Sequence, residues 1–294
     1  MALNIFDLHC HSWFSDGTLS PTDVVNRAAK NGVRFLSITD HDTIEGLEEA
    51  EHAAHNANIT LIPGIELSVT WNNTTLHVVG LNIDRTTTIL KHATAKIAQI
   101  RFERAKAMAL DLEKAGIPNA FEGAMRFARS EHLLTRTHFA RFLVDKGLCA
   151  NLSKVYKNYL KRGKPGYIKS TWLSLEDAIR IIKDSKGIAV LAHPGRYDLS
   201  SSARKKLLNE FAELGGGALE VTTSNHTPEQ TAYFTENCLR LGLKASCGSD
   251  FHSPDESRID LGGVIPFPSI LTPVWAEWLP YFPSLSSTEY TAQC

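Results

Sequence analysis

The chain has few cysteines and no long apolar run. Its 294 residues include five cysteines, an odd number without CxxC spacing, which argues against a disulfide scaffold. No segment approaches the length of a membrane span, and the N-terminus lacks the basic segment and apolar core of a signal peptide. Internal repeats and low-complexity tracts are also missing. We therefore expect an unexported cytoplasmic protein, with no membrane contact and no obligate protein partner.

The net charge is close to zero, but the charged residues are unevenly distributed along the chain. The total is −1, whereas residues 96–169 carry +10 and the remainder carries −11. A basic segment of this size indicates either solvated helix faces or a binding surface for a polyanion. We favour the second interpretation, which predicts a phosphate-rich ligand for the middle of the chain.

Strand-like and helix-like segments alternate through most of the sequence, a pattern typical of an α/β protein with parallel strands and right-handed crossovers. Helix starts are marked by capping residues at Ser20 and Ser174, and a hairpin is expected to turn at Asn72-Asn73. Helical periodicity replaces the strand signals between residues 89 and 172, which predicts a helical insertion. The expected strands include residues 35–39, 59–65, 76–81, 188–192, 218–221 and 244–247.

Histidines and carboxylates recur where the expected strands end. His9 and His11 are two residues apart in an extended segment, so both imidazoles point to the same side and can hold one metal ion. One such histidine is more often structural, but repetition at six strand ends predicts an open, multinuclear metal centre. The residues in these positions are His9, His11, Asp40, His41, Glu66, His77, His193, Asp250 and His252. The histidines outside this pattern are expected to be surface or structural residues: His52, His55, His92, His132 and His226.

The motifs around these residues resemble the motif set of the polymerase and histidinol phosphatase (PHP) superfamily of metal-dependent phosphoesterases. In chain order they are Asp7-Leu8-His9-Cys10-His11-Ser12 with Ser15-Asp16-Gly17, Thr39-Asp40-His41-Asp42, Gly64-Ile65-Glu66, His77, Ala192-His193-Pro194 and Gly248-Ser249-Asp250-Phe251-His252. The resemblance implies a distorted seven-stranded β/α barrel built from residues 1–88 and 173–270. Residues 89–172 would form a helical cap over the substrate, and residues 271–294 an irregular tail.

The resemblance also implies a centre of three divalent metal ions, with manganese favoured and iron or zinc as alternatives. Asp7 would hold a ligand imidazole through its other ring nitrogen. The implied ligands are His9, His11, Glu66 and Asp250 for one ion, Glu66, His77 and His193 for the second, and Asp16, His41 and His252 for the third.

The insertion and two local motifs resemble a bacterial branch of the superfamily. The motifs are Arg136-Thr137-His138-Phe139-Ala140-Arg141 and His193-Pro194-Gly195-Arg196-Tyr197. Members of that branch remove the 3′-phosphate from nucleoside 3′,5′-bisphosphates, as in the conversion of adenosine 3′,5′-bisphosphate to AMP, and some trim short RNAs from the 5′ end. The resemblance implies that Arg136, His138 and Arg196 bind the substrate. Phe139, Tyr156 and Tyr167 either stack on a base or pack between helices.

The expected chemistry is in-line attack of metal-activated hydroxide on phosphorus, because clustered divalent ions neutralise phosphate oxygens and lower the pKa of water. A histidinol phosphate phosphatase with the same metal centre is an alternative, although its cationic substrate gives no reason for a basic insertion. An alternative of another class is a nucleic-acid-binding module in which the metals are structural.

Overall fold

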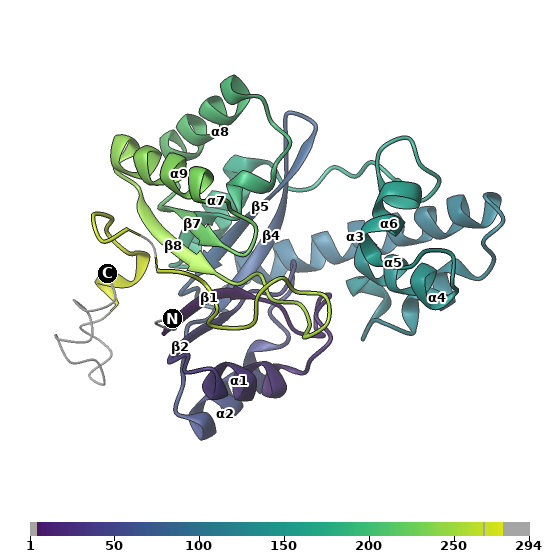
Figure 1. Cartoon of the computed structure of the whole chain (residues 1–294), viewed down its shortest axis with the longest axis horizontal. Helices are drawn as coiled ribbons and strands as arrows, with labels where there is room; N and C mark the ends of the chain where they lie inside the picture. Colours follow the sequence, from purple (N-terminus) through teal and green to yellow (C-terminus); the bar gives the residue numbers. More distant parts are fainter. Residues whose placement is uncertain (1–4, 267, 279–294) are drawn as a thin grey trace.

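The computed structural model describes residues 5–266 and 268–278 (Figure 1). The strands are β1 (Phe6–Cys10), β2 (Phe35–Ile38), β3 (Thr60–Leu61), β4 (Gly64–Trp71), β5 (Thr74–Leu81), β6 (Ile188–Leu191), β7 (Ala218–Thr223) and β8 (Lys244–Gly248). The α-helices are α1 (Pro21–Lys30), α2 (Leu47–Ala57), α3 (Thr88–Lys114), α4 (Ala120–Met125), α5 (Arg136–Asp145), α6 (Leu152–Val155), α7 (Leu175–Asp184), α8 (Ser201–Glu213) and α9 (Pro228–Leu241). Within these residues, no helix is both long and apolar enough to cross a bilayer.

The strands form two sheets, with the order β1-β2-β3 in one and β4-β5-β6-β7-β8 in the other. The hairpin between β4 and β5 is confirmed: Asn72 and Asn73 have φ values of 44° and 61°, the left-handed conformation that a two-residue hairpin turn requires. β5 is antiparallel to both β4 and β6, whereas the remaining pairs are parallel. The fold is therefore mixed α/β rather than uniformly parallel.

The expected seven-stranded barrel is not what the described residues show, because no continuous ladder closes the two sheets. They meet instead through isolated bridges, Cys10 with Phe251 and His41 with Glu66. The expected strand over residues 59–65 is also divided into β3 and β4 around Pro63, whose ring removes a backbone donor. Glu66 consequently lies inside β4, and His77 lies inside β5, rather than at strand ends.

The helix starts follow the capping signals in the sequence. The hydroxyls of Ser20 and Ser174 accept hydrogen bonds from the backbone N–H groups of Asp23 and Asp177, three residues into α1 and α7. The second helix, α2, begins at Leu47 without a side-chain cap. Residues 39–46 form a loop in which Asp42 has a φ of 57°.

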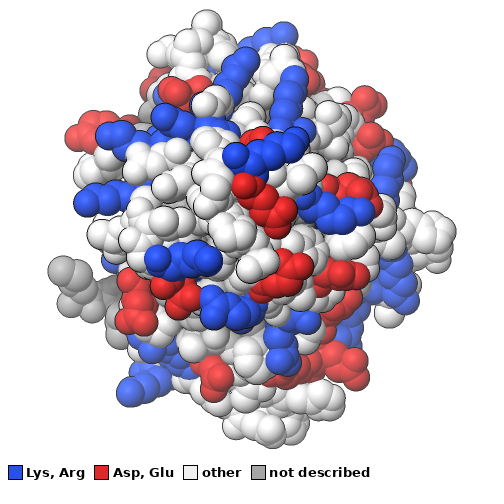
Figure 2. All heavy atoms as spheres, turned by 90° about the vertical axis from the view of Figure 1, so that its right-hand side faces the viewer, with Lys and Arg blue, Asp and Glu red and all other residues white. Residues whose placement is uncertain are grey.

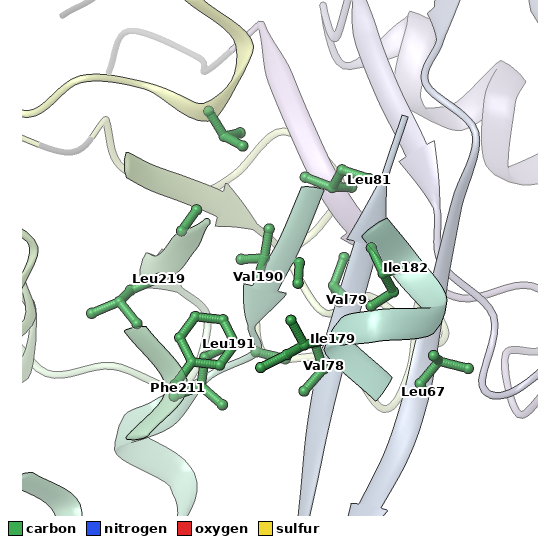
Figure 3. Close-up of a cluster of buried hydrophobic side chains, with 14 of the residues drawn as sticks. Leu67, Val78, Val79, Leu81, Ile179, Ile182, Val190, Leu191, Phe211 and Leu219 are labelled. Carbon is green, nitrogen blue, oxygen red and sulfur yellow. The ribbon is translucent and has the colours of Figure 1, made fainter. Parts of the chain in front are cut away.

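Most buried apolar residues lie in one core between the larger sheet and its helices. Figure 3 shows Ile179 and Ile182 of α7 against Val78 and Val79 of β5, with Phe211 of α8 in the same cluster. Each such side chain contributes about 1.5–3 kcal/mol when it is fully buried. This core holds the strands that carry the site in fixed register.

The insertion has a hydrophobic core of its own, separated in Figure 1 from the sheets. Helix α3 joins the two: Leu90, Ala93 and Ile97 lie in the main core, whereas Met108 and Leu112 lie in the insertion core. The segment expected to be an irregular tail begins at residue 271, and its first part, residues 271–278, packs onto the main core. The rest of that segment, residues 279–294, lies outside the described residues.

Phe139 belongs to the insertion core and is 0% exposed, so its role is helix packing rather than base stacking. Replacing it by alanine removes a large buried ring, and we expect a loss of about 3–5 kcal/mol in the free energy of unfolding, measured by urea denaturation. Phe121, which is only partly buried against the same core, provides the control, and Phe121→Ala should cost clearly less. Equal losses for the two variants would contradict this packing.

Candidate metal centre

Nine histidine and carboxylate side chains converge between the sheets and the insertion. In each of four overlapping groups, one potential ligand atom from every residue lies within 4.8 Å of the others. The groups are His11, Asp16, His41 and His252; His9, Glu66 and His193; His9, His11 and Asp250; and His41, Glu66 and His77. The structure thus brings together the nine residues that the family resemblance implied as ligands, whereas Asp40, which the strand-end pattern also marked, is not among them.

Glu66 lies at the middle of the cluster and is 0% exposed. Five imidazole nitrogens surround its two oxygens. The separations are 3.3 Å to His9 Nε2, 3.1 Å to His193 Nε2 and 3.0 Å to His77 Nδ1 from Oε1, and 3.4 Å to His11 Nε2 and 2.8 Å to His41 Nδ1 from Oε2. A carboxylate in this position would hold divalent metal ions together with these imidazoles.

Asp250 closes one side of the cluster. Its Oδ1 lies 3.4 Å from His11 Nε2 and 3.7 Å from His9 Nε2. Its Oδ2 accepts hydrogen bonds from Arg196 at 3.0 Å and from Asn225 at 3.1 Å. One carboxylate oxygen therefore faces the imidazoles while the other is held from outside.

The two carboxylate oxygens of Asp16 likewise face different partners. Its Oδ1 lies 3.3 Å from His252 Nε2 and 3.7 Å from His41 Nε2. Its Oδ2 accepts hydrogen bonds from the hydroxyls of Thr135 at 3.2 Å and Thr137 at 2.8 Å, both at the start of α5. The insertion is thereby attached directly to a potential ligand.

Two carboxylates and two histidines of the cluster are in the protonation states that bind metal, whereas nearby carboxylates raise the pKa of His9, His41 and His252 despite their burial. Burial lowers the pKa of His11 to about 3 and that of His77 to about 4, so both imidazoles are neutral at pH 7. Burial alone would raise the pKa of the Asp16 and Asp250 carboxyls, but the neighbouring histidines lower it well below its usual range. Neutral imidazoles and ionised carboxylates are the forms that coordinate divalent ions.

Several buried atoms at the centre of the cluster lie close to one another, yet they form no well-directed hydrogen bond among the described residues. Buried polar groups without partners are rare in native proteins, so the site requires a further ligand for them. The atoms concerned include Asp16 Oδ1, His41 Nδ1, Glu66 Oε2 and His77 Nδ1. A set of nitrogen and oxygen donors without thiolates suits manganese, iron or zinc, and the residues present fit such ions.

Two aspartates of the motif Asp40-His41-Asp42 support the cluster from behind. Asp40 accepts hydrogen bonds from the hydroxyls of Ser12 and Ser15, both at 2.6 Å, and so fixes the loop after β1. Asp42 accepts hydrogen bonds from the backbone N–H and the hydroxyl of Ser68, and it pairs with Arg101 of α3. The carboxylates on either side of His41 therefore hold the loop after β1, strand β4 and helix α3 in place.

A polar pocket opens from the cluster toward the insertion. Asp16, His41, His77 and His252 lie on its wall, so the pocket reaches the candidate ligands directly. Positive side chains line much of the remaining wall: Arg101, Arg104, Arg136, Lys169 and Arg196. Of these, Arg136 and Arg196 were predicted from the sequence. Arg101, Arg104 and Lys169 were not, because their only signal was the charge excess of the whole segment.

The comparisons with known proteins agree with this geometry. The sequence pattern of the PHP domain matches residues 7–224. The chain belongs to the PHP domain family. Over 271 residues it is 44% identical to a 3′,5′-nucleoside bisphosphate phosphatase of Chromobacterium violaceum, covering 92% of this chain and 95% of the relative. It is 43% identical over 276 residues to the 5′-3′ exoribonuclease Rnm of Escherichia coli K12, covering 93% and 94%.

A solved structure supports the relationship. A Chromobacterium violaceum protein described as an amidohydrolase with bound sulfate and no metal superposes with a TM-score of 0.90 at 43% identity, and the match covers 93% of this chain and 95% of that one. The PHP assignment and the arrangement of the described strands and helices therefore agree over nearly the whole chain.

Two residues of this PHP domain have contacts different from those the sequence predicted. Asp7 was expected to hold a ligand imidazole, but its carboxylate accepts main-chain N–H groups of Ser249 and Gly262, both at 2.9 Å. His138 was expected to bind substrate, but it is 0% exposed, and its Nδ1 accepts the N–H of Thr135 to cap α5. A side chain at the third position of a helix can complete a capping box, and His138 does so at the start of α5.

Two histidines have contacts with partners that are distant in sequence, and one of these contacts is the structural role expected for His226. Nδ1 of His9 faces the buried carboxylate of Glu220, a residue on β7 that no sequence motif marked. His226 was expected to be a surface or structural residue, and its Nε2 accepts the N–H of Gly195. It therefore holds the turn that carries Arg196. In both cases the partners are distant in sequence, so local patterns carried no signal.

Proposed function

We propose that this protein is a metal-dependent phosphoesterase that removes the 3′-phosphate from nucleoside 3′,5′-bisphosphates, with AMP as the product from adenosine 3′,5′-bisphosphate. Short 5′-phosphorylated RNA is proposed as a second substrate of the same site. The observation that carries the proposal is a pocket whose floor holds the candidate metal ligands and whose walls hold five cationic side chains. Relatives that are 44% and 43% identical to this chain are a nucleoside bisphosphate phosphatase and a 5′-3′ exoribonuclease, which supports this substrate class.

The nine converging residues are proposed to hold three divalent ions, with manganese favoured. When bound, such ions neutralise phosphate oxygens and make hydroxide available near neutral pH. The reaction breaks the bond between phosphorus and the 3′ oxygen, adds a water oxygen to phosphorus and returns a proton to the 3′ oxygen. The chain itself must position the substrate and exclude competing water.

Arg196 is placed to position the phosphate that reacts. Its guanidinium donates to Asp250 Oδ2 at 3.0 Å and lines the pocket next to the metal ligands. A guanidinium presents several N–H groups in one plane, so Arg196 can keep this contact while donating to phosphate oxygens. The main-chain turn that bears it is fixed by Gln230, whose Nε2 donates to the carbonyl of Gly195 at 2.9 Å.

A second phosphate is accommodated by Arg104 and Arg136. Burial, together with the nearby Arg136 and Arg101, lowers the pKa of Arg104 to about 9, so it remains charged at pH 7. Arg104 contacts Trp172 and Arg136 contacts Tyr156 through cation–π interactions, and neither arginine forms an ion pair with a carboxylate among the described residues. Two neighbouring cations without an acidic partner form a binding site for an anion.

The distribution of charge on the surface favours the same interpretation. Figure 2 faces the side of the molecule that carries the insertion, and it shows lysines and arginines interspersed with acidic residues rather than one uniform basic patch. Part of the positive excess of the insertion is instead directed into the pocket. This arrangement suits a small, highly charged substrate.

Phosphate release tests the proposal. The purified protein supplied with Mn²⁺ should release phosphate and AMP from adenosine 3′,5′-bisphosphate, and it should shorten a 5′-phosphorylated RNA from its 5′ end. Removal of metal by a chelator should reduce release to background because no side chain in the pocket can replace the metal-activated nucleophile. Absence of release from the bisphosphate, together with brisk hydrolysis of histidinol phosphate, would overturn the proposal.

A further inference from the structure

Glu220 is a buried carboxylate that the proposed mechanism does not use. It lies on β7, between β6 and β8, and is 2% exposed. Burial of a carboxylate costs several kcal/mol unless charged or hydrogen-bonding partners satisfy it. Its partners therefore indicate why it is there.

Both oxygens of Glu220 contact candidate metal ligands from other parts of the chain. Oε1 lies 3.0 Å from Nδ1 of His9, which belongs to β1. Oε2 accepts the main-chain N–H of His193 at 2.6 Å, just after β6. One carboxylate thus connects two ligands that are separated by more than half of the sequence.

The contact with His9 determines which ring nitrogen is available. A carboxylate only accepts hydrogen bonds, so the contact favours the tautomer in which His9 Nδ1 carries the proton. The lone pair then lies on Nε2, which faces Glu66 at 3.3 Å and His11 Nε2 at 3.3 Å. This is the nitrogen that points into the cluster.

The contact with His193 fixes the main chain. His193 has a φ of 29°, a conformation that residues with a Cβ atom rarely adopt. The hydrogen bond from its N–H to Glu220 holds this turn, and the turn directs Nε2 of His193 to within 3.1 Å of Glu66. The carboxylate therefore positions one ligand through its ring and the other through its backbone.

The neighbouring strand leaves room for this arrangement. At Gly248 of β8, an added Cβ would lie 2.2 Å from Cβ of His9 and 2.9 Å from Oε1 of Glu220. A larger residue at Gly248 would displace the histidine, the carboxylate or both.

We propose that Glu220 is a positioning residue of the metal centre, which fixes the tautomer of His9 and the turn that aims His193. The proposal rests on the proposed metal-dependent function, but it concerns metal affinity rather than substrate turnover. It makes Glu220 a determinant of how tightly the divalent ions are held.

Glu220→Gln is a sharp test because glutamine is nearly isosteric. The amide oxygen can still accept the His193 N–H, which leaves the NH₂ group to donate to His9 Nδ1 and forces the ring proton onto Nε2. We expect the variant to fold normally but to bind Mn²⁺ about 10–100-fold more weakly, as measured by calorimetric titration of metal-free protein and by metal content after dialysis. Thr222→Val is the control: Thr222 is buried on the same strand, and its hydroxyl has no hydrogen-bond partner among the described residues.

The outcomes separate this inference from the proposed function. If the unaltered protein binds Mn²⁺ and Glu220→Gln binds it equally tightly, the inference is overturned and the function stands. If the unaltered protein binds no divalent metal, the function itself fails. Should Glu220→Gln not fold, ¹⁵N-histidine NMR of the unaltered protein loaded with diamagnetic Zn²⁺ decides the matter: a proton on Nδ1 of His9 supports the inference, and a proton on Nε2 overturns it.

Discussion

Replacing Glu66 by glutamine is expected to lower phosphate release from adenosine 3′,5′-bisphosphate by at least about 1,000-fold. The carboxylate lies among five imidazoles and would hold metal ions together with them. An uncharged amide there weakens metal binding and removes several kcal/mol of transition-state stabilisation, where about 1.4 kcal/mol corresponds to a tenfold change in rate. Initial rates and metal content of the purified variant provide the measurement. Asp250→Ala and His9→Ala should have comparable effects.

The matched control is Glu210→Gln. Glu210 is a carboxylate of α8 that accepts a hydrogen bond from Trp71 Nε1 at 3.0 Å, and it takes no part in the metal centre. Its variant should keep normal turnover. Circular dichroism should show that the Glu66, Asp250 and His9 variants remain folded. Substantial residual hydrolysis in the ligand variants would contradict the catalytic assignment. It would favour a nucleic-acid-binding module with structural metals, whose affinity should fall steeply with salt.

Replacing Arg104 by glutamine is expected to alter substrate discrimination. We expect kcat/KM for adenosine 3′,5′-bisphosphate to fall about 10–100-fold, since a hydrogen bond to a charged group contributes about 1.5–3 kcal/mol. The value for adenosine 3′-monophosphate should hardly change because that substrate lacks the second phosphate. Steady-state kinetics with the two substrates measures the ratio directly.

Arg162→Gln makes the same change of charge at an exposed position of the insertion and should leave both substrates unaffected. Equal losses for bisphosphate and monophosphate in Arg104→Gln would show that Arg104 supports the metal centre or the fold. An unchanged ratio with normal activity would place the second phosphate elsewhere in the pocket.

The clustering of the candidate ligands was the part of the molecule most predictable from sequence. His9, His11 and Asp250 belong to short motifs that resemble those of the PHP family. The expectation that the candidate ligands all lie at strand ends was only partly met, because Glu66 lies within β4 and His77 within β5. An antiparallel hairpin can present ligands from the middle of a strand to the same site, and residue alternation alone does not reveal this placement.

Contacts between distant segments were not predictable in the same way. Arg104 lies in a long helix where nothing in the local pattern distinguishes a pocket residue from a solvated one. Glu220 and the turn at His193 are neighbours only because β6 and β7 pair in parallel. The separation of the strands into two open sheets was also not predictable from local patterns. Strand spacing indicated α/β alternation, whereas closure of a barrel depends on strand register and twist, which are set when the strands pack.

Helix α3 has a consequence for how substrate preference can evolve. Arg101 and Arg104 lie where the helix passes from the main core, ending at Ile97, to the insertion core, beginning at Ala105. Sequence drift within the insertion core can therefore shift Arg104 by small amounts, whereas Arg101 is held by its ion pair with Asp42 and the strands that carry the ligands remain untouched. Thr137 and Arg141, which hold the side chain and the carbonyl of Asp16, set the limit of such drift. Substitutions confined to the insertion core should therefore alter the position of Arg104 while leaving the main core and its strands unchanged.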